Sequence, residues 1–319
     1  MYPLKLKPTV SSTIWGGRRL IDEYSIKTDK ENAAEAWVLS CHPNGQSIVE
    51  NGQFAGKPLG EVFNNNKSMI GTNGEKFSEF PILIKLIDAR DNLSIQVHPD
   101  EEYARRVENE AGKTECWYIL DCDEGAEIIL GFKEKITSEQ FKNAIENDSL
   151  LDYIQKSKVK KGDFFFIESG TLHAICKGIL LAEVQQNSNT TYRVYDYNRI
   201  GADGKARPLH IDKSVDVTKT VPYKTNEIKE CKANELYAEN KKCLTSCDLF
   251  SVFVYDAEGE FESFADEKSF VSLLALEGDG LVECMGEKID FKKGECIFLP
   301  AASGKYVIKG TIKVLETRI

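Results

Sequence analysis

The chain has 319 residues, of which 41% are hydrophobic and 10% aromatic, an ordinary globular composition with enough apolar side chains for about two domains. Its 41 lysines and arginines are outnumbered by 51 aspartates and glutamates, so the formal net charge is −10. This balance argues against a general affinity for nucleic acid or for an anionic membrane, although it leaves room for a local basic pocket that binds one small anion.

The sequence also lacks the signals of membrane insertion and secretion. Its longest apolar stretches, such as Phe164–Ile167 and Leu273–Leu276, are much shorter than the ~18 residues of a membrane helix. Residues 1–8 contain no apolar h-region, so we expect no signal peptide. The nine cysteines are odd in number and form no CxxC pair, which indicates reduced thiols and a cytoplasmic protein.

In chain order, short β-branched and aromatic runs between Gly, Asn, Asp and Pro predict a mostly β fold. The predicted strands of the first two thirds are Pro81–Ile87, Leu93–His98, Trp117–Asp121, Ile128–Phe132, Phe164–Ile167, Leu180–Val184 and Tyr192–Tyr197. A short helix is expected after Pro99, over Asp100–Arg106. A capping box at Thr137–Gln140, followed by apolar residues at helical spacing, predicts one or two further helices from Thr137 to about Lys156.

An internal repeat indicates two similar β units. Lys160–Ile167 resembles Lys292–Leu299, and aligning the two copies places Lys305 opposite His173. The predicted strands of the second copy are Ser272–Leu276, Cys296–Leu299, Tyr306–Ile308 and Lys313–Glu316. We expect one unit over residues 1–225, a metal-free unit over residues 226–319, and a junction in the lysine-rich segment Val221–Asn234.

The segment Leu93–Pro99 alternates strictly between apolar and polar residues. Ser94, Gln96 and His98 share the polar face of the predicted strand, where Gln and His side by side are a plausible pair of metal ligands. Taken alone, Ser94 or Gln96 is better explained by a solvated strand face, but His98 favours a site because the chain has only four histidines.

Two further donors follow along the chain. Glu115 opens an apolar strand, and His173 follows a turn at the start of another strand. Taken singly, the first is more often exposed and the second is more often a hydrogen-bonded core residue. Donors from successive strands of a small barrel can nevertheless converge on one ion, and the order Gln96, His98, Glu115, His173 fits that arrangement.

The sequence resembles the type I mannose-6-phosphate isomerases (phosphomannose isomerases), particularly their short bacterial form. The resemblance rests on residues 14–17 (Ile-Trp-Gly-Gly), residues 35–45, Leu93–Asp100 and Glu183–Arg193, and it spans most of the chain. It implies two cupin (RmlC-like) β-barrels or jelly rolls, with a helical insertion near residues 137–156 of the first. It also implies one zinc ion per chain, held by Gln96, His98, Glu115 and His173, with Arg193 in the catalytic pocket.

The sequence departs from the family pattern at two places. Family members often carry His-Lys-Pro-Glu before the third ligand, whereas this chain has Gly112-Lys113-Thr114-Glu115, so a mechanism with that His as the base cannot operate here. The usual Ser-Asp-Asn ahead of the catalytic Arg is Ser188-Asn189-Thr190, which lacks the carboxylate.

The implied reaction interconverts mannose 6-phosphate and fructose 6-phosphate through an enediolate, which needs a base and an electrophile. Arg193 suits developing negative charge or the phosphate. Glu183 is equally well explained as the base and as a partner of Arg193. Lys113 is the expected phosphate contact, with Ser94 supporting it, and Lys205 and Arg207 are weaker candidates.

Other interpretations remain open. Two histidines and a glutamate also suit a non-haem iron dioxygenase on a cupin barrel, although the fourth ligand Gln96 argues against it. A non-catalytic sugar-phosphate-binding protein is the second alternative. We expect a small-molecule sugar phosphate as the partner and a monomer or weak homo-oligomer. His42 and His210 do not fit the ligand order and are assigned to structure.

Overall fold

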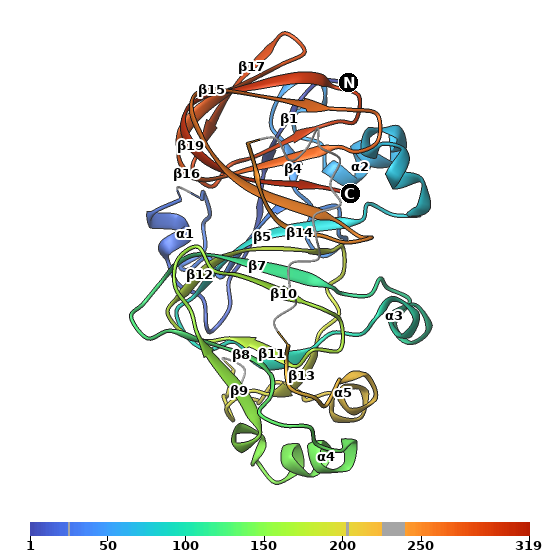
Figure 1. Ribbon diagram of the computed structural model, residues 1–319, viewed down its shortest axis with the longest axis vertical. Coiled ribbons are helices and arrows are strands. Elements are labelled where there is room, and N and C mark those ends of the chain that lie inside the picture. Colours follow the sequence, from blue (N-terminus) through green and yellow to red (C-terminus); the bar gives the residue numbers. More distant parts are fainter. Residues whose placement is uncertain (25, 202–203, 225–239) are drawn as a thin grey trace.

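Three antiparallel β-sheets, stacked along the long axis of the molecule, make up most of the fold (Figure 1). The computed structural model describes residues 1–24, 26–201, 204–224 and 240–319. Within these ranges, no helix has both the length and the apolar character needed to cross a membrane. The predicted boundary at residues 225 and 226, and much of the predicted junction, lie outside the described residues, so the division into units remains a prediction.

Two of the sheets face each other as a sandwich in the lower half of Figure 1, with a shared apolar core that includes Trp117, Leu181 and Leu130. One sheet has the order β10 (Phe164–Ile167), β7 (Glu115–Cys122), β12 (Ile179–Gln186), β5 (Ile82–Ala89), β3 (Glu35–Leu39) and β2 (Thr9–Ser11). The other has the order β13 (Tyr192–Tyr195), β6 (Ile95–Val97), β11 (His173–Ile175), β8 (Glu127–Phe132) and β9 (Ile154–Lys158).

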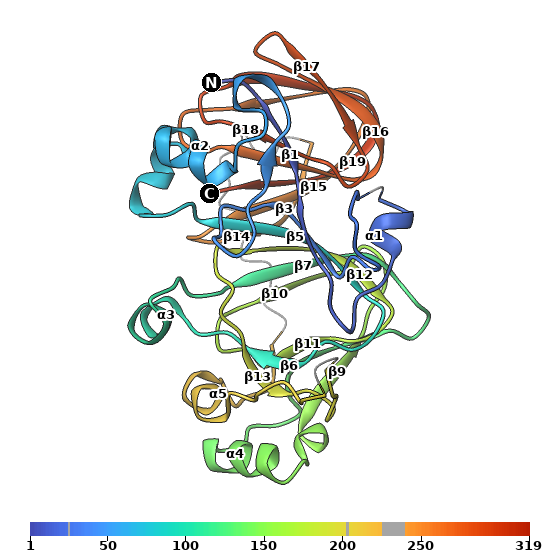
Figure 2. The same ribbon diagram turned by 180° about the vertical axis from the view of Figure 1, so that it is seen from behind.

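The third sheet combines both ends of the chain. Its path runs through β14 (Lys242–Ser246), β15 (Ser251–Ala265), β19 (Gly304–Arg318), β16 (Val271–Cys284), β18 (Cys296–Leu299), β1 (Leu4–Lys7) and β4 (Ile48–Val49), and β17 (Glu287–Lys292) pairs with β16. The N-terminal strand β1 thus lies beside β18, as Figure 2 shows. Phe298 and Phe270 of this half pack with Ile82 and Ile84 of β5 in one apolar core, which joins the two halves of the molecule.

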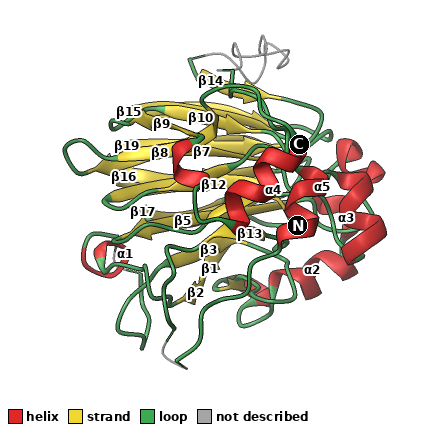
Figure 3. Ribbon diagram, turned by 90° about the horizontal axis from the view of Figure 1, so that it is seen from below, coloured by secondary structure: helices red, strands yellow, loops and turns green. Residues whose placement is uncertain are grey.

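The helices lie mostly on one side of the strands, where α2, α3, α4 and α5 gather in Figure 3. Apolar residues of α4, such as Phe141 and Ile145, share a core with Val97 and Phe132 of the five-stranded sheet and cover its outer face. The helices are α1 (Arg19–Asp22), α2 (Leu59–Asn65), α3 (Glu101–Glu108), α4 (Ser138–Glu146) and α5 (Ile211–Val217), and the 3-10 turns are η1 (Gly52–Phe54), η2 (Lys67–Ile70), η3 (Thr72–Lys76) and η4 (Leu150–Asp152).

Several expectations are met and others need correction. The capping box at Thr137 and the helix after Pro99 are confirmed, but the expected helical segment ends early because residues 154–156 form the start of β9. The expected closed barrels are wrong: the described strands form open sheets, since the strands of the sandwich bond within two separate layers. Cys243 is disulfide-bonded, so the expectation that every thiol is reduced fails there, whereas seven other cysteines are free.

The internal repeat is visible in the hydrogen bonding of two turns. Gly162 and Gly294 both have positive φ, at 87° and 85°, a conformation that glycine adopts without steric strain. In each turn the following acidic side chain, Asp163 or Glu295, accepts a hydrogen bond from the backbone N–H three residues earlier. The two copies therefore share their turn geometry as well as their sequence.

Candidate metal centre and catalytic pocket

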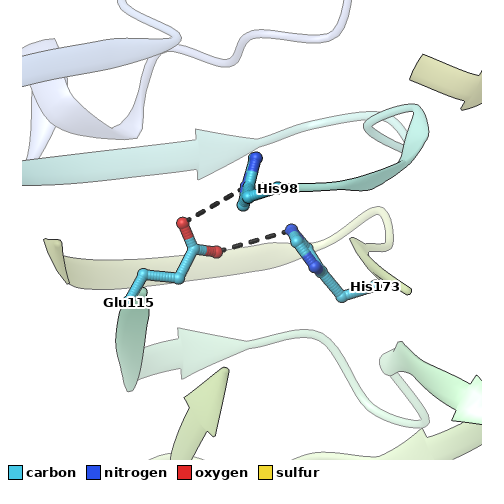
Figure 4. A group of neighbouring side chains, drawn as sticks. All are labelled: His98, Glu115 and His173. Carbon is cyan, nitrogen blue, oxygen red and sulfur yellow. Dashed lines mark ion pairs between the residues drawn. The ribbon is translucent and has the colours of Figure 1, made fainter. Parts of the chain in front are cut away.

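Three buried side chains converge inside the sandwich (Figure 4). Glu115 is the first residue of β7, His98 follows β6, and His173 is the first residue of β11. The Nε2 atom of His98 lies 3.4 Å from Glu115 Oε2, and the Nε2 atom of His173 lies 3.5 Å from Oε1. Their potential ligand atoms all lie within 4.8 Å of one another, a separation that one bound ion can span.

Strand register brings a fourth donor to the same place. Gln96 is opposite His173 in the pairing of β6 with β11, so both side chains point to the same face. The amide of Gln96 lies 3.4 Å from His173 Nε2, and a flip of that amide exchanges its nitrogen and oxygen. The geometry therefore groups all four residues of the predicted ligand set.

Backbone carbonyls fix the orientation of both histidines. The Nδ1 atom of His98 lies 3.0 Å from the carbonyl oxygen of Thr190, and that of His173 lies 2.9 Å from the carbonyl oxygen of Thr171. A carbonyl only accepts, so each Nδ1 carries the hydrogen and each Nε2 presents a lone pair to Glu115. Burial lowers the pKa of His98 to about 3 and lowers that of His173, which keeps both rings neutral.

Glu115 supplies the one carboxylate of this group of side chains. The side chain is 0% exposed, and its one charged partner among the described residues besides the two histidines is Lys113, whose Nζ lies 2.9 Å from Oε2. Burial alone would raise its pKa, but Lys113 and His98 outweigh that effect and lower the pKa well below the usual range. Two imidazoles, one carboxylate and one amide are nitrogen and oxygen donors that fit a zinc ion.

Lys113 lies at this centre. It is only 4% exposed, and its Nζ atom is 2.9 Å from Glu115 Oε2 and 3.1 Å from His98 Nε2. The neighbouring Gly112 has no room for a side chain, because a Cβ atom there would lie 2.4 Å from the backbone nitrogen of Glu101. A histidine at position 112 would therefore require the backbone near Glu101 to move.

Arg193 borders the same centre from β13. It is opposite Gln96 in the pairing of β13 with β6. Its Nη1 donates a hydrogen bond to the carbonyl oxygen of Pro208 (3.1 Å), whereas its buried Nε donates to no described group. Asp196 is held by Arg199 and by Arg207. Burial and the charge of Arg207 lower the pKa of Arg193, whereas the charge of Asp196 opposes this shift.

Glu183 lies in the sandwich beside the metal centre and is 3% exposed. It accepts a hydrogen bond from Trp117 Nε1 (3.0 Å) and pairs with Lys85 (3.3 Å). The alternative in which it pairs with Arg193 is therefore wrong. Burial and the nearby Glu115 raise its pKa, whereas Lys85 opposes the rise. Sequence reasoning missed Lys85, although a lysine inside the apolar strand Ile82–Ala89 was the signal for it.

The other residues considered in the sequence are Ser94, His210, Arg207 and Lys205. Ser94 is buried, two residues before Gln96 on the same alternating face. His210 accepts a hydrogen bond at Nδ1 from the backbone N–H of Arg193 (3.0 Å), so it supports the strand that carries the arginine. Arg207 donates to Asp196 (2.6 Å), which also pairs with Arg199, and Lys205 lies two residues before Arg207.

Family models match both ends of the chain. A model described as phosphomannose isomerase type I, catalytic domain, matches residues 3–143, and one described as mannose-6-phosphate isomerase, cupin domain, matches residues 239–319. The probable mannose-6-phosphate isomerase GmuF of Bacillus subtilis is 40% identical over 98% of each chain. The mannose-6-phosphate isomerase of Streptococcus mutans is 38% identical over 99% of this chain and 98% of its own.

Solved structures agree with these matches. The crystal structure of the mannose 6-phosphate isomerase from Bacillus subtilis superposes with a TM-score of 0.91 at 38% identity and covers 100% of both chains. Phosphomannose isomerase from Salmonella typhimurium, at 18% identity and a TM-score of 0.78, shares the fold over 99% of each chain. The chain described here, mostly β and with a cupin domain, therefore belongs to the type I phosphomannose isomerase family.

Proposed function

We propose that this protein interconverts mannose 6-phosphate and fructose 6-phosphate at a zinc ion held by Gln96, His98, Glu115 and His173. The observation that carries the proposal is the buried group of His98, Glu115 and His173, whose potential ligand atoms all lie within 4.8 Å of one another. The sequence relatives at about 40% identity over the whole chain bear names of the same activity. When bound, the zinc ion supplies positive charge that polarises or orients sugar oxygens.

The reaction moves one proton between adjacent carbons. Removal of the C2 proton of the open-chain aldose, with a proton supplied to O1, gives the enediol. Return of a proton to C1, with loss of the O2 proton, gives the ketose. Glu183 is proposed as the base, because its raised pKa suits a carboxylate that takes and returns a proton.

Lys113 and Arg193 are the two cationic residues that we assign to the substrate. Lys113 lies within the ligand cluster, so we assign it to the reacting oxygens rather than to the phosphate. Arg193 is opposite Gln96 in the sheet, and Arg207 and Arg199 are close enough for their charges to lower its pKa. Its guanidinium group suits either the enediolate or the phosphate dianion.

The first test is isomerase activity together with metal content. Purified protein should convert mannose 6-phosphate to fructose 6-phosphate, contain about one zinc per chain, and lose turnover when a chelator removes the metal. His98→Ala and His173→Ala should lose both metal and turnover. Lys305→Ala is the matched control at the repeat position of His173, because Lys305 is 59% exposed and pairs with Glu262 on the surface. Full activity in metal-free protein would contradict the proposal.

The second test concerns the base. If Glu183 moves the C2 proton, Glu183→Gln should lower kcat by about 10²-fold or more and abolish exchange of that proton with solvent. Lys85→Met serves as a companion variant, because it removes the ion pair of Glu183 but leaves the carboxylate in place. Exchange that persists in Glu183→Gln would assign the base to another residue.

A further inference from the structure

One carboxylate joins three loops at the edge of the metal centre. Glu110 lies between α3 and β7, His42 lies between β3 and β4, and Asn189 and Thr190 lie between β12 and β13. Glu110 Oε1 accepts hydrogen bonds from His42 Nε2 and from the backbone N–H of Asn189, both at 2.8 Å. Glu110 Oε2 accepts a third from the Thr190 hydroxyl at 2.6 Å.

His42 is fixed as a donor to this carboxylate. Its Nδ1 accepts a hydrogen bond from the backbone N–H of Asn44 (3.1 Å), so the ring hydrogen is on Nε2, which faces Glu110. The ring also packs edge-on against Trp37, with 5.8 Å between centroids. The ring therefore donates to Glu110 from a position fixed by Asn44 and Trp37.

The same loop supplies the acceptor that orients a metal ligand. The carbonyl oxygen of Thr190 accepts the hydrogen bond from His98 Nδ1, at 3.0 Å. Two residues hold Thr190 in place. Glu110 accepts hydrogen bonds from the Thr190 hydroxyl and from the backbone N–H of Asn189. The Ser188 hydroxyl accepts one from the backbone N–H of Thr190 (3.2 Å). The contacts run without interruption from His42 through Glu110 and Thr190 to His98.

We infer that Glu110 is a positioning residue for the metal centre: by holding the Asn189–Thr190 loop it keeps the Thr190 carbonyl against His98 Nδ1, and so keeps His98 Nε2 directed at the metal. The inference rests on the proposed metal site. It also accounts for the missing carboxylate in Ser188-Asn189-Thr190, because Glu110 delivers a carboxylate to the same loop from another part of the chain.

The decisive experiment compares zinc affinities by competition with a chelator. Outer partners of metal-bound histidines typically account for about 10- to 100-fold in affinity, so Glu110→Ala should bind zinc that much more weakly. Thr190→Val, which keeps the carbonyl and loses one hydroxyl donor, should weaken binding by about two- to tenfold. Glu102→Ala is the control, since it removes the same charge from an exposed position on α3 and should bind zinc like the parent.

A positioning role also predicts how activity responds. At saturating zinc, Glu110→Ala should recover kcat to within about threefold of the parent with little change in KM, because the reacting groups are intact. Zinc affinity in Glu110→Ala and Thr190→Val equal to that of Glu102→Ala would overturn the inference. Absence of zinc binding or turnover in the parent chain would instead count against the proposed function, so the two failures are distinguishable.

The ring nitrogens of His98 give a readout that needs no metal. The chain contains four histidines, so the 15N signals of labelled histidine side chains can be assigned with His98→Gln. The metal-free parent should show His98 with its hydrogen on Nδ1, whereas Glu110→Ala should show a mixture of both tautomers. A single Nδ1–H tautomer in folded Glu110→Ala would contradict the inference.

Discussion

The chemistry of individual residues here depends on which neighbour each polar atom faces. His98 and His173 each direct Nδ1 to a backbone carbonyl and Nε2 to Glu115, so one constraint sets both the tautomer and the direction of the ring. Lys113 and Arg193 are both cationic, yet Lys113 is ion-paired inside the ligand cluster and Arg193 donates to the carbonyl of Pro208. We therefore expect different kinetic effects from their removal.

Substitution of Arg193 separates its two possible tasks. If the guanidinium stabilises the enediolate, Arg193→Ala should lower kcat by about 10²-fold or more, the scale of one lost transition-state donor. If it binds the phosphate, KM should rise while kcat stays nearly constant. Arg193→Lys keeps the charge but loses the planar fork, so partial recovery would indicate a simple charge requirement. Steady-state kinetics with mannose 6-phosphate decide between these outcomes, and unchanged kcat and KM would exclude both roles.

At the scale of single elements, local signals and packing support each other in α4. Thr137 Oγ1 accepts a hydrogen bond from the backbone N–H of Gln140 (3.1 Å), and Gln140 Oε1 accepts one from the N–H of Thr137 (2.8 Å). The ring of Phe141 then packs edge-on against Phe132 of β8, with 5.4 Å between centroids. Because this helix covers the outer face of the sheet, it stabilises the sandwich without touching the metal centre.

Loss of the capping box should therefore reduce stability and spare catalysis. Thr137→Ala removes one side-chain acceptor at the helix N-terminus and should lower the free energy of unfolding by about 1 kcal/mol, measured by urea denaturation. Thr137→Ser retains an oxygen acceptor and should lie close to the parent. kcat should be unchanged in both variants. A loss above ~3 kcal/mol, or a changed kcat, would show that the helix end supports more than its own first turn.

For the molecule as a whole, the C-terminal sheet has a buried polar cluster of its own. Glu316 accepts hydrogen bonds from Lys241 (2.6 Å), Tyr306 (2.8 Å) and Arg318 (2.7 Å), and all four side chains are buried. Burial would raise the pKa of Glu316, but Arg318 and Lys241 lower it to about 2. Burial lowers the pKa of Lys241 to about 8, so the ammonium is still charged at neutral pH.

This cluster predicts a defined response of stability to acid. Because the pKa of Glu316 is about 2 in the folded chain and near 4.5 when unfolded, its ionisation stabilises the fold above pH ~4.5. That stabilisation disappears as the pH falls from ~4.5 towards 2. Glu316→Gln should lower the free energy of unfolding at pH 7 by about 3–5 kcal/mol, because it removes the carboxylate that pairs with the buried ammonium of Lys241.

The measurement is urea denaturation of parent and variant at several pH values. The difference in unfolding free energy between them should shrink below pH 4.5. Zinc content per folded chain should stay equal, since the metal centre lies in the other half of the molecule. A difference that is constant from pH 7 to pH 3 would contradict the assigned pKa of Glu316.

The sequence alone determined the features that depend on near neighbours: alternation along Leu93–Pro99, the capping box at Thr137, and the repeated glycine turns. It also indicated which residues gather at the candidate metal centre. Only tertiary structure decided that Glu183 pairs with Lys85 and that Glu110 reaches Thr190, since those residues lie far apart along the chain. The same holds for β19, predicted as two short strands. It is continuous because β15 and β16 hydrogen-bond along it from either side, and such pairing is a property of the assembled sheet.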